Sequence, residues 1–202
     1  MTKMQKTTKF IILSAMLPLL FFSSAMAQTS TMADVFRQMP DSLLPYITHN
    51  DRLDMIDYVE AGMKAEVTNK LDGKSVLDSI GNNYLHLTLS EALVVEMGIL
   101  PVEELTEDSC SNVVCVVSTY AGMESTLKFY TSKWQEWQPQ PSLEIADMLP
   151  TNDSDRYVIA TFGKSPEEIV LSLSKPILTE TSEQEENNKY RKNIKWTGKT
   201  FK

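Results

Sequence analysis

A histidine and three aspartates fall within nine residues near the amino end of the chain, at His49, Asp51, Asp54 and Asp57. Imidazole nitrogens and carboxylate oxygens bind metal ions and transfer protons, so this grouping is compatible with a metal site or an acid/base site. Its periodicity favours another interpretation. At 100° per residue the three aspartates centre about 160° from the apolar stripe of the same predicted helix. That stripe consists of Leu53, Ile56, Val59, Met63 and Val67.

We therefore predict a helix from Asn50 or Asp51 to about Glu66 whose aspartates form its solvated outer face. Negative charge in the first turn also complements the helix dipole. The alternative is a small hydrolase in which His49 acts with Asp51 or Asp54. That hypothesis requires these side chains to converge in a pocket.

Trp134 and Trp137 are the next candidates, in "SKWQEWQPQP". Two tryptophans at the end of a strand are compatible with a platform on which a sugar or a peptide stacks. The alternative, which we favour, is that both rings close the core where the sheet meets the helices. Trp134 and Trp137 are the two residues that we consider as candidates for ligand binding.

Other catalytic patterns are missing from the sequence. It contains only two histidines, His49 and His86, and has no HExxH, G-x-S-x-G or glycine-rich phosphate loop. We expect His86 to lie on the polar face of its strand. The sequence predicts no catalytic residue, no metal site and no cofactor, and favours a protein that is not an enzyme.

The sequence has two cysteines, Cys110 and Cys115, and leaves open whether they form a disulfide. Five extended residues separate two Cα atoms by about 16 Å, whereas a bridge spans about 4.4–6.8 Å. A bridge would thus require a tight turn between the two residues. We favour Cys115 as a buried apolar residue and leave Cys110 unassigned.

Residues 1–27 have the three parts of a secretory signal: three lysines, the apolar run "FIILSAMLPLLFF" and the small residues "AMA" before a cleavage point between Ala27 and Gln28. The 13-residue run is shorter than the roughly 20 residues that span a bilayer. We expect an exported protein of the periplasm or the extracellular space, with no transmembrane segment in the mature chain. Its net charge of −11, compared with −8 for the full sequence, disfavours binding to nucleic acid.

The patterns predict an α+β fold in which amino-terminal helices pack on a mainly antiparallel sheet of about 6–8 strands. Residues 28–202 would form one domain, mainly helical over 28–67 and mainly strands over 68–202. "YLHLTLS", "ALVVEMGIL", "NVVCVVSTY", "MESTLKFYTSKW", "RYVIATF" and "EEIVLSLSK" indicate strands. "NVVCVVSTY" is apolar on both faces, as in a central strand, and the lysine-rich "YRKNIKWTGKTFK" is typical of an edge strand.

The run "MADVFRQMPDSLLPYITHNDRLDMIDYVEAGMKAEVTNKLDGKS" (32–75) after a secretory signal resembles the opening of an uncharacterised family of exported Bacteroidales proteins, a domain of unknown function. "YLHLTLSE" and "IKWTGKTF" are compatible with it. The resemblance implies an envelope or secreted location and supplies no activity and no catalytic residue.

The resulting functional hypothesis is a non-enzymatic exported binding or accessory module of the bacterial cell envelope, with an unidentified protein or glycan as partner. A second alternative to the hydrolase is a carrier of a small apolar ligand. A carrier requires an internal cavity lined by Leu85, Leu87, Val95 and their neighbours.

Overall fold

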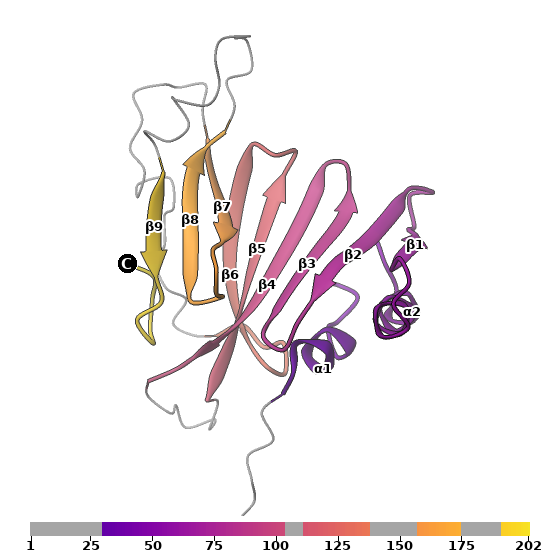
Figure 1. Cartoon of the computed structure of the whole chain (residues 1–202), viewed down its shortest axis with the longest axis horizontal. Helices are drawn as coiled ribbons and strands as arrows, with labels where there is room; N and C mark the ends of the chain where they lie inside the picture. The colour runs from indigo at the N-terminus through magenta and orange to yellow at the C-terminus, as the bar shows by residue number, and fades with distance from the viewer. Residues whose placement is uncertain (1–29, 104–110, 138–156, 175–190) are drawn as a thin grey trace, which may run out of the picture.

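Two short helices precede nine strands in this computed structural model, which describes residues 30–103, 111–137, 157–174 and 191–202. Helix α1 spans Met32–Arg37 and helix α2 spans His49–Glu60 (Figure 1). In the part of the chain that is described, no helix is long and apolar enough to cross a membrane.

Both helices begin with a capping box. The Thr31 hydroxyl accepts a hydrogen bond from the amide of Asp34, whose carboxylate accepts one from the amide of Thr31. Thr48 and Asp51 form the same reciprocal pair at the start of α2. Each pair satisfies two amides that would otherwise lack a partner in the first helical turn.

Helix α2 ends at Glu60, so the prediction that it continues to about Glu66 is wrong. Gly62 adopts φ 68° and the Met63 amide donates to the carbonyl of Tyr58, while the Gly62 amide donates to Val59. This is a Schellman end, in which a left-handed glycine closes the last turn. Gly62 therefore stops a helix that the apolar pattern alone would continue.

The buried side of α2 also differs from the predicted stripe. Arg52, Met55 and Ile56 are buried, whereas the Met63 side chain, beyond the helix, is 56% exposed. At 100° per residue this buried side is rotated by about 50° from the predicted stripe. Arg52 is drawn inward because one guanidinium nitrogen lies 2.9 Å from an Asp41 carboxylate oxygen and also donates to the Met39 carbonyl.

Six strands form one antiparallel sheet in the order β1-β2-β3-β4-β5-β6, each paired with the next along the chain. The mainly antiparallel architecture is thus confirmed. Strands β1 and β2 were not predicted, because β1 has only three residues and an irregularity after Leu77 interrupts the alternation of β2. The bounds are β1 Glu66–Thr68, β2 Lys74–Ile80, β3 Tyr84–Ser90, β4 Leu93–Pro101, β5 Asn112–Tyr120 and β6 Glu124–Thr131.

The last three strands form a second antiparallel sheet, β7-β8-β9, so the expectation of a single sheet is wrong. Strand β7 spans Val158–Phe162, β8 spans Glu168–Leu173 and β9 spans Lys192–Lys195. Strand β9 is an edge strand, as its lysines predict. The small sheet lies on the β6 side of the molecule and the helices lie on the β1 side (Figure 1).

The core consists of two hydrophobic clusters on opposite faces of the six-stranded sheet. The helix-side cluster combines residues of α1 and α2 with strand residues such as Leu85 and Leu87. The far-side cluster joins β4–β6 to β7–β9. Strand β5 contributes to both: Val114 and Val116 to the helix-side cluster, and Val113, Cys115 and Val117 to the far-side cluster. The prediction of a central strand covered on both faces is confirmed.

Strand β7 lies on the far face of the large sheet instead of extending its ladder. A Cβ on Gly98 would lie 2.8 Å from the ring of Phe162 and from Pro166, so only a glycine admits this close approach. At β6, the Ala160 amide donates to the Ser125 hydroxyl over 3.0 Å. A side chain thus takes the place of a backbone partner, and the two sheets remain separate.

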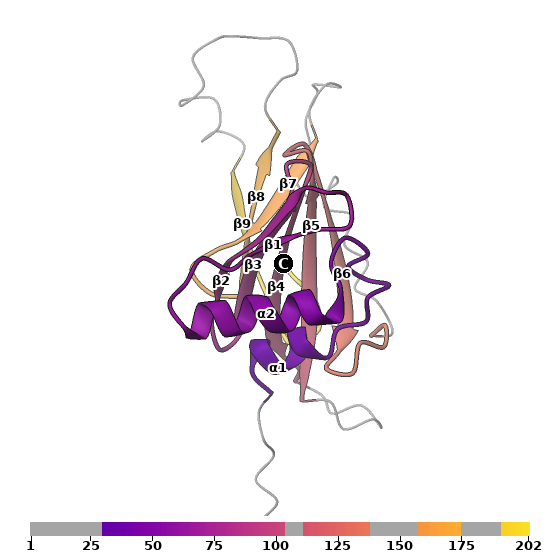
Figure 2. The same cartoon turned by 90° about the vertical axis from the view of Figure 1, so that its right-hand side faces the viewer.

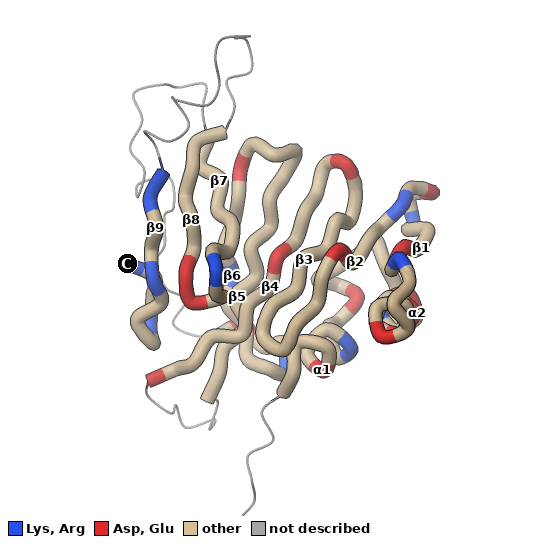
Figure 3. The backbone as a smooth tube through the Cα atoms, in the orientation of Figure 1, with Lys and Arg blue, Asp and Glu red and all other residues tan. Residues whose placement is uncertain are grey.

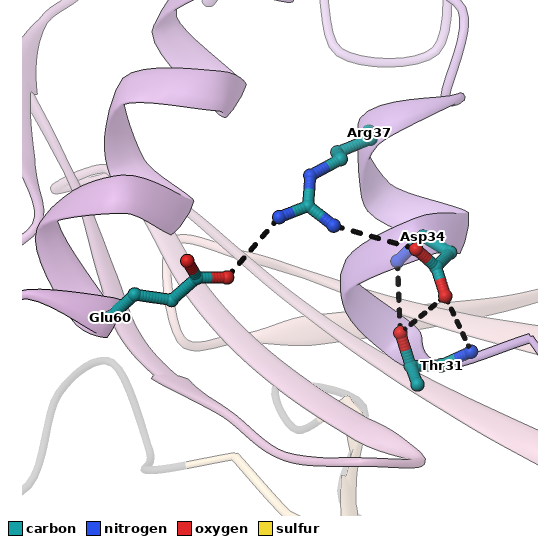
Figure 4. A network of polar contacts seen from close by, with 4 residues as sticks. All are labelled: Thr31, Asp34, Arg37 and Glu60. Carbon is teal, nitrogen blue, oxygen red and sulfur yellow. Dashed lines mark hydrogen bonds and ion pairs between the residues drawn. The ribbon is translucent and has the colours of Figure 1, made fainter.

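The two helices are joined by one arginine. Arg37 of α1 lies 3.4 Å from Asp34 and 3.2 Å from Glu60 at the end of α2 (Figure 4). Helix α2 runs across the direction of the strands, with α1 beside it (Figure 2). Both helices therefore lie on the side of the molecule that carries the helix-side cluster.

Candidate functional site

The histidine and aspartates of the first hypothesis remain apart. His49, Asp54 and Asp57 are exposed. Asp51 is engaged by Thr48, whose amide and hydroxyl both donate to its carboxylate, over 2.6 and 2.8 Å. Within the described ranges no hydrogen bond or ion pair joins His49 to either aspartate. The outer helix face is confirmed, and the convergence that the hydrolase hypothesis requires is not formed.

Trp134 and Trp137 do not form a stacking platform, because they are buried on opposite faces of the sheet, with exposed fractions of 7% and 9%. The Trp134 indole nitrogen donates to the Val35 carbonyl over 2.9 Å. Trp137 packs against Phe129 and Trp196, with ring centroids 6.3 and 6.1 Å away. The alternative prediction, that both rings close the core where the sheet meets the helices, therefore holds for Trp134 and is wrong for Trp137, which closes the far-side cluster instead.

The leucines and valine proposed to line a carrier cavity lie in the helix-side cluster. Leu85 and Leu87 are 0% exposed and Val95 is 2% exposed, in the same cluster as Met32 and Met55 of the helices. Two surface hollows of the described chain are lined by other residues. The carrier hypothesis therefore gains no support at these positions.

The far face of β1–β3 carries a surface that we call the open face. Along β3 its outward positions alternate with buried ones and are half-buried. They stay partly accessible because strand β7 packs mainly on β4–β6. Figure 3 shows acidic positions on β2 and β4 near the middle of the sheet, away from the basic positions of β9. By register, the open face comprises Glu66, Thr68, Lys74, Val76, Asp78, Ser79, Tyr84, His86 and Thr88.

Asp78 is the centre of the hydrogen bonds on the open face. It occupies a β-bulge, since the register of β2 against β3 shifts between Leu77 and Ser79. Its Oδ2 accepts from the Thr88 hydroxyl over 2.7 Å and from the Thr88 amide over 3.1 Å, and lies 3.0 Å from His86 Nδ1. A bulge redirects one side chain out of the regular alternation, which is why Asp78 reaches the neighbouring strand.

His86 lies between two carboxyl groups on adjacent strands. Asp78 approaches from β2, and Glu96 is its direct cross-strand partner on β4. An ionised Asp78 can only accept hydrogen bonds, so the contact holds the proton on Nδ1 and leaves Nε2 as the other ring nitrogen available to a ligand. The imidazole is therefore oriented by the fold.

Glu96 is a buried carboxyl group at the margin of the open face, with 5% of its surface exposed. The Tyr84 hydroxyl donates to it over 2.6 Å. Burial raises the pKa of Glu96, while the Tyr84 hydrogen bond, the nearby His86 and a backbone hydrogen bond from Phe162 oppose the rise. A carboxyl group whose pKa is raised in this way, next to a fixed histidine, is a feature typical of functional sites.

Tyr84 connects the open face to the covered part of the sheet. Its ring packs edge-on against Phe162 at a centroid distance of 5.8 Å. Burial, followed by the hydrogen bond to Glu96, raises the pKa of Tyr84. Tyr84 therefore remains protonated at neutral pH and acts as a hydrogen-bond donor to Glu96.

Cys115 is a free, fully buried thiol on β5. Burial raises its pKa, and the charge of Glu96 adds to that effect. A thiol without thiolate character is a poor nucleophile, so the prediction of a buried apolar role is confirmed. Cys110 lies outside the described residues.

In the four described ranges, no three His, Cys, Asp or Glu side chains lie together in a way that could hold a metal ion. The open face, together with Glu96 at its margin, instead offers one imidazole nitrogen, two carboxyl groups and two hydroxyls, from Asp78, Glu96, Tyr84, His86 and Thr88. These groups can bind a polar ligand by hydrogen bonds.

The sequence placed His86 on a polar face but did not reveal its neighbours. Asp78, Tyr84 and Glu96 lie at alternating strand positions of ordinary composition, and Glu96 interrupts the apolar run "ALVVEMGIL". The charged residue within this apolar run is the one feature of the sequence that indicates a site near Glu96. Identifying His86 as its neighbour also requires the register of β3 against β4, which places the two residues opposite each other.

Comparison with known families and structures gives a family and a fold. The family model described as Protein of unknown function (DUF3256) matches residues 23–186. This agrees with the resemblance of residues 32–75, while "IKWTGKTF" lies beyond the match. No curated protein matches significantly.

A solved structure of a domain of an uncharacterized protein from Porphyromonas gingivalis W83 is similar to this chain, at 21% sequence identity and a TM-score of 0.61. The similarity covers 86% of this chain and 98% of that one. At this identity it shows a shared fold alone. Its source agrees with the Bacteroidales link of the resemblance.

Proposed function

This chain belongs to the family described as Protein of unknown function (DUF3256), and from that premise we propose that it is an exported, non-enzymatic binding module of the bacterial cell envelope. The open face is its binding surface. The observation that carries the proposal is the fixed group of Asp78, His86 and Glu96 on a sheet face that no described element covers fully.

Several properties of the open face support binding. Its hydrogen-bonding groups are held by each other, so a ligand meets a surface whose side chains have already lost most of their rotamer freedom. The face carries both signs of charge, with Glu66 2.5 Å from Lys64 and 3.5 Å from Lys74. A mixed, polar surface suits a hydrophilic partner, either a protein or a glycan.

The α+β class and the single domain over residues 28–202 are part of the proposal. The shared helix-side cluster supports the two helices as the cover of one sheet face. The far-side cluster supports one folding unit, because β7–β9 complete the core of the large sheet. Neither cluster would be closed without the other elements.

A non-enzymatic role is supported by how the polar groups are engaged. Asp78 is occupied by three contacts, Glu96 by Tyr84, and Cys115 is a buried thiol. Protein purified without chelators is expected to contain no stoichiometric metal. Stoichiometric zinc or calcium in elemental analysis would count strongly against this part of the proposal.

Export is supported by the three-part pattern of residues 1–27. The expected mature protein begins at Gln28. Fractionation of the native host and the intact mass of the recovered protein test this. A chain that retains residues 1–27 and stays in the cytoplasmic fraction would contradict export.

Photocrosslinking in the native host tests the binding surface. A photoreactive amino acid replaces Val76, a partly exposed residue of the open face, or Asp57, on the outer face of α2, as a matched control. We expect an adduct from position 76 and none from position 57. Sensitivity of that adduct to protease or to glycosidases distinguishes a protein partner from a glycan. Equal adducts from both positions, or none from position 76, would overturn the proposal.

A further inference from the structure

A polar hollow lies on the outer face of the three-stranded sheet, on the side turned away from the far-side cluster. Its volume is about 410 Å³, within the range of pockets that hold small molecules. Its lining comes from the end of β7, from the turn between β7 and β8, from β8 itself, and from β9 and the residue before it. The residues that matter for its chemistry are Thr161, Lys164, Glu168, Val170, Arg191 and Asn193.

The floor of this hollow is a cross-strand row. Thr161 pairs with Val170, and Val170 pairs with Asn193. Val170 is only 8% exposed although it faces away from the far-side cluster. The row therefore places one small, largely covered apolar contact between a hydroxyl and an amide, which suits the ring of a small molecule that has both C–H and O–H groups.

Glu168 is fixed at one side of the floor. The Asn193 amide donates to its Oε1 over 2.8 Å. A Cβ on Gly163 would lie 2.7 Å from Oε2, so the carboxylate lies over a position that only glycine leaves free. The Glu168 carboxylate is therefore a hydrogen-bond acceptor whose orientation is set by Asn193 and by the absence of a side chain at Gly163.

Two cations border the hollow. Lys164 and Arg191 are both exposed, and neither forms an ion pair or a side-chain hydrogen bond within the described residues. Together with Glu168 they give the hollow a net charge of +1, in a chain whose net charge is −8. A guanidinium binds a carboxylate in a bidentate manner, and an ammonium adds a point charge.

We propose that this hollow binds an acidic monosaccharide unit that carries one carboxylate, either free or at the end of a glycan. Arg191 and Lys164 bind the carboxylate, Glu168, Thr161 and Asn193 bind hydroxyls, and Val170 contacts the apolar face of the sugar ring. A single negative charge matches the net charge of the hollow. The site is independent of the open face and does not rest on the function proposed for it.

Calorimetric titration of the mature protein with glucuronate, glucose, acetate and inorganic phosphate tests this proposal. Glucuronate is expected to bind, with glucose and acetate weaker by about tenfold or more, because each lacks one half of the recognised groups. Arg191→Ala and Lys164→Ala are each expected to weaken glucuronate binding by about tenfold. Arg191→Lys should fall between Arg191→Ala and the wild type.

Two control variants locate the binding. Lys133→Ala and Lys128→Ala each remove an exposed lysine elsewhere, and both should bind glucuronate as the wild type does. Phosphate that binds as well as glucuronate would show a general anion patch and overturn the proposal. So would an absence of glucuronate binding, or binding that survives in Arg191→Ala.

Discussion

Glu96, the buried carboxyl group at the margin of the open face, has a raised pKa because it is buried. A group whose pKa is raised in the folded state binds its proton more tightly there than in the unfolded chain. Its contribution to stability is therefore full below the ordinary value of 4.5 and is lost as the pH rises through the folded value.

The Glu96→Gln variant tests this linkage. Glutamine cannot ionise, so the free energy of unfolding of the variant, relative to the wild type, should increase as the pH is raised from 4 to 8. Urea unfolding at several pH values measures the difference. Glu91→Gln, at an exposed carboxylate, is the matched control and should show no such trend. A pH-independent difference at Glu96 would contradict the assigned burial effect.

Arg52 gives a second prediction at this scale. It is 1% exposed, and its Nε and one terminal nitrogen find no partner among the described residues. Unpaired buried donors are destabilising, so an apolar side chain of similar size should be tolerated. The free energy of unfolding of Arg52→Met is expected to lie within about 1 kcal/mol of the wild-type value. That of Arg52→Ala is expected to be about 3 kcal/mol lower, because the substitution leaves a cavity.

Thermal and urea unfolding of both Arg52 variants measure these free energies. If Arg52→Met loses as much stability as Arg52→Ala, the ion pair with Asp41 stabilises the fold and the argument from unpaired donors is wrong.

Individual residues were predictable from the sequence where a local pattern decides their environment. Periodicity correctly placed Asp54 and Asp57 outside, and alternation correctly placed Cys115 inside. Asp78 and Glu96 were not predictable as partners of His86, because that contact depends on a bulge and on cross-strand register.

At the scale of elements, glycines decide where strands and helices end and how closely they approach. Gly62 ends α2 six residues before the apolar pattern does. Gly98 lets β7 rest on β4. The sequence shows a glycine at both positions, but only the tertiary arrangement shows which contact each one permits.

Gly98→Ala is expected to destabilise the fold by about 1–3 kcal/mol, because the new methyl group would overlap the Phe162 ring and Pro166. Gly81→Ala is the matched control, since the nearest atom to its Cβ, the Tyr84 carbonyl oxygen, is 3.9 Å away. Urea unfolding of both variants measures the difference. A Gly98→Ala protein as stable as Gly81→Ala would contradict the packing described for β7.

At the scale of the whole molecule, one sheet has two covered parts and one open part. One face of the six-stranded sheet shares a hydrophobic cluster with residues of both helices, and the other face shares one with β7–β9 at β4–β6, so the open face of β1–β3 remains. The sequence predicted most of the strands but assigned them to one sheet, and it did not predict their order in the sheet. The division into two sheets depends on the side chains of Ser125 and Phe162, which carry no periodic signal.

We propose that the polar group on the open face serves binding. The most direct measurement is the yield of the adduct formed from a photoreactive amino acid at position 76, compared between His86→Ala and His49→Ala. The two variants remove the only two histidines of the chain, one on the open face and one on the exposed start of α2. We expect His86→Ala to lose the adduct and His49→Ala to retain it, at equal thermal stability. An undiminished adduct in His86→Ala would contradict it.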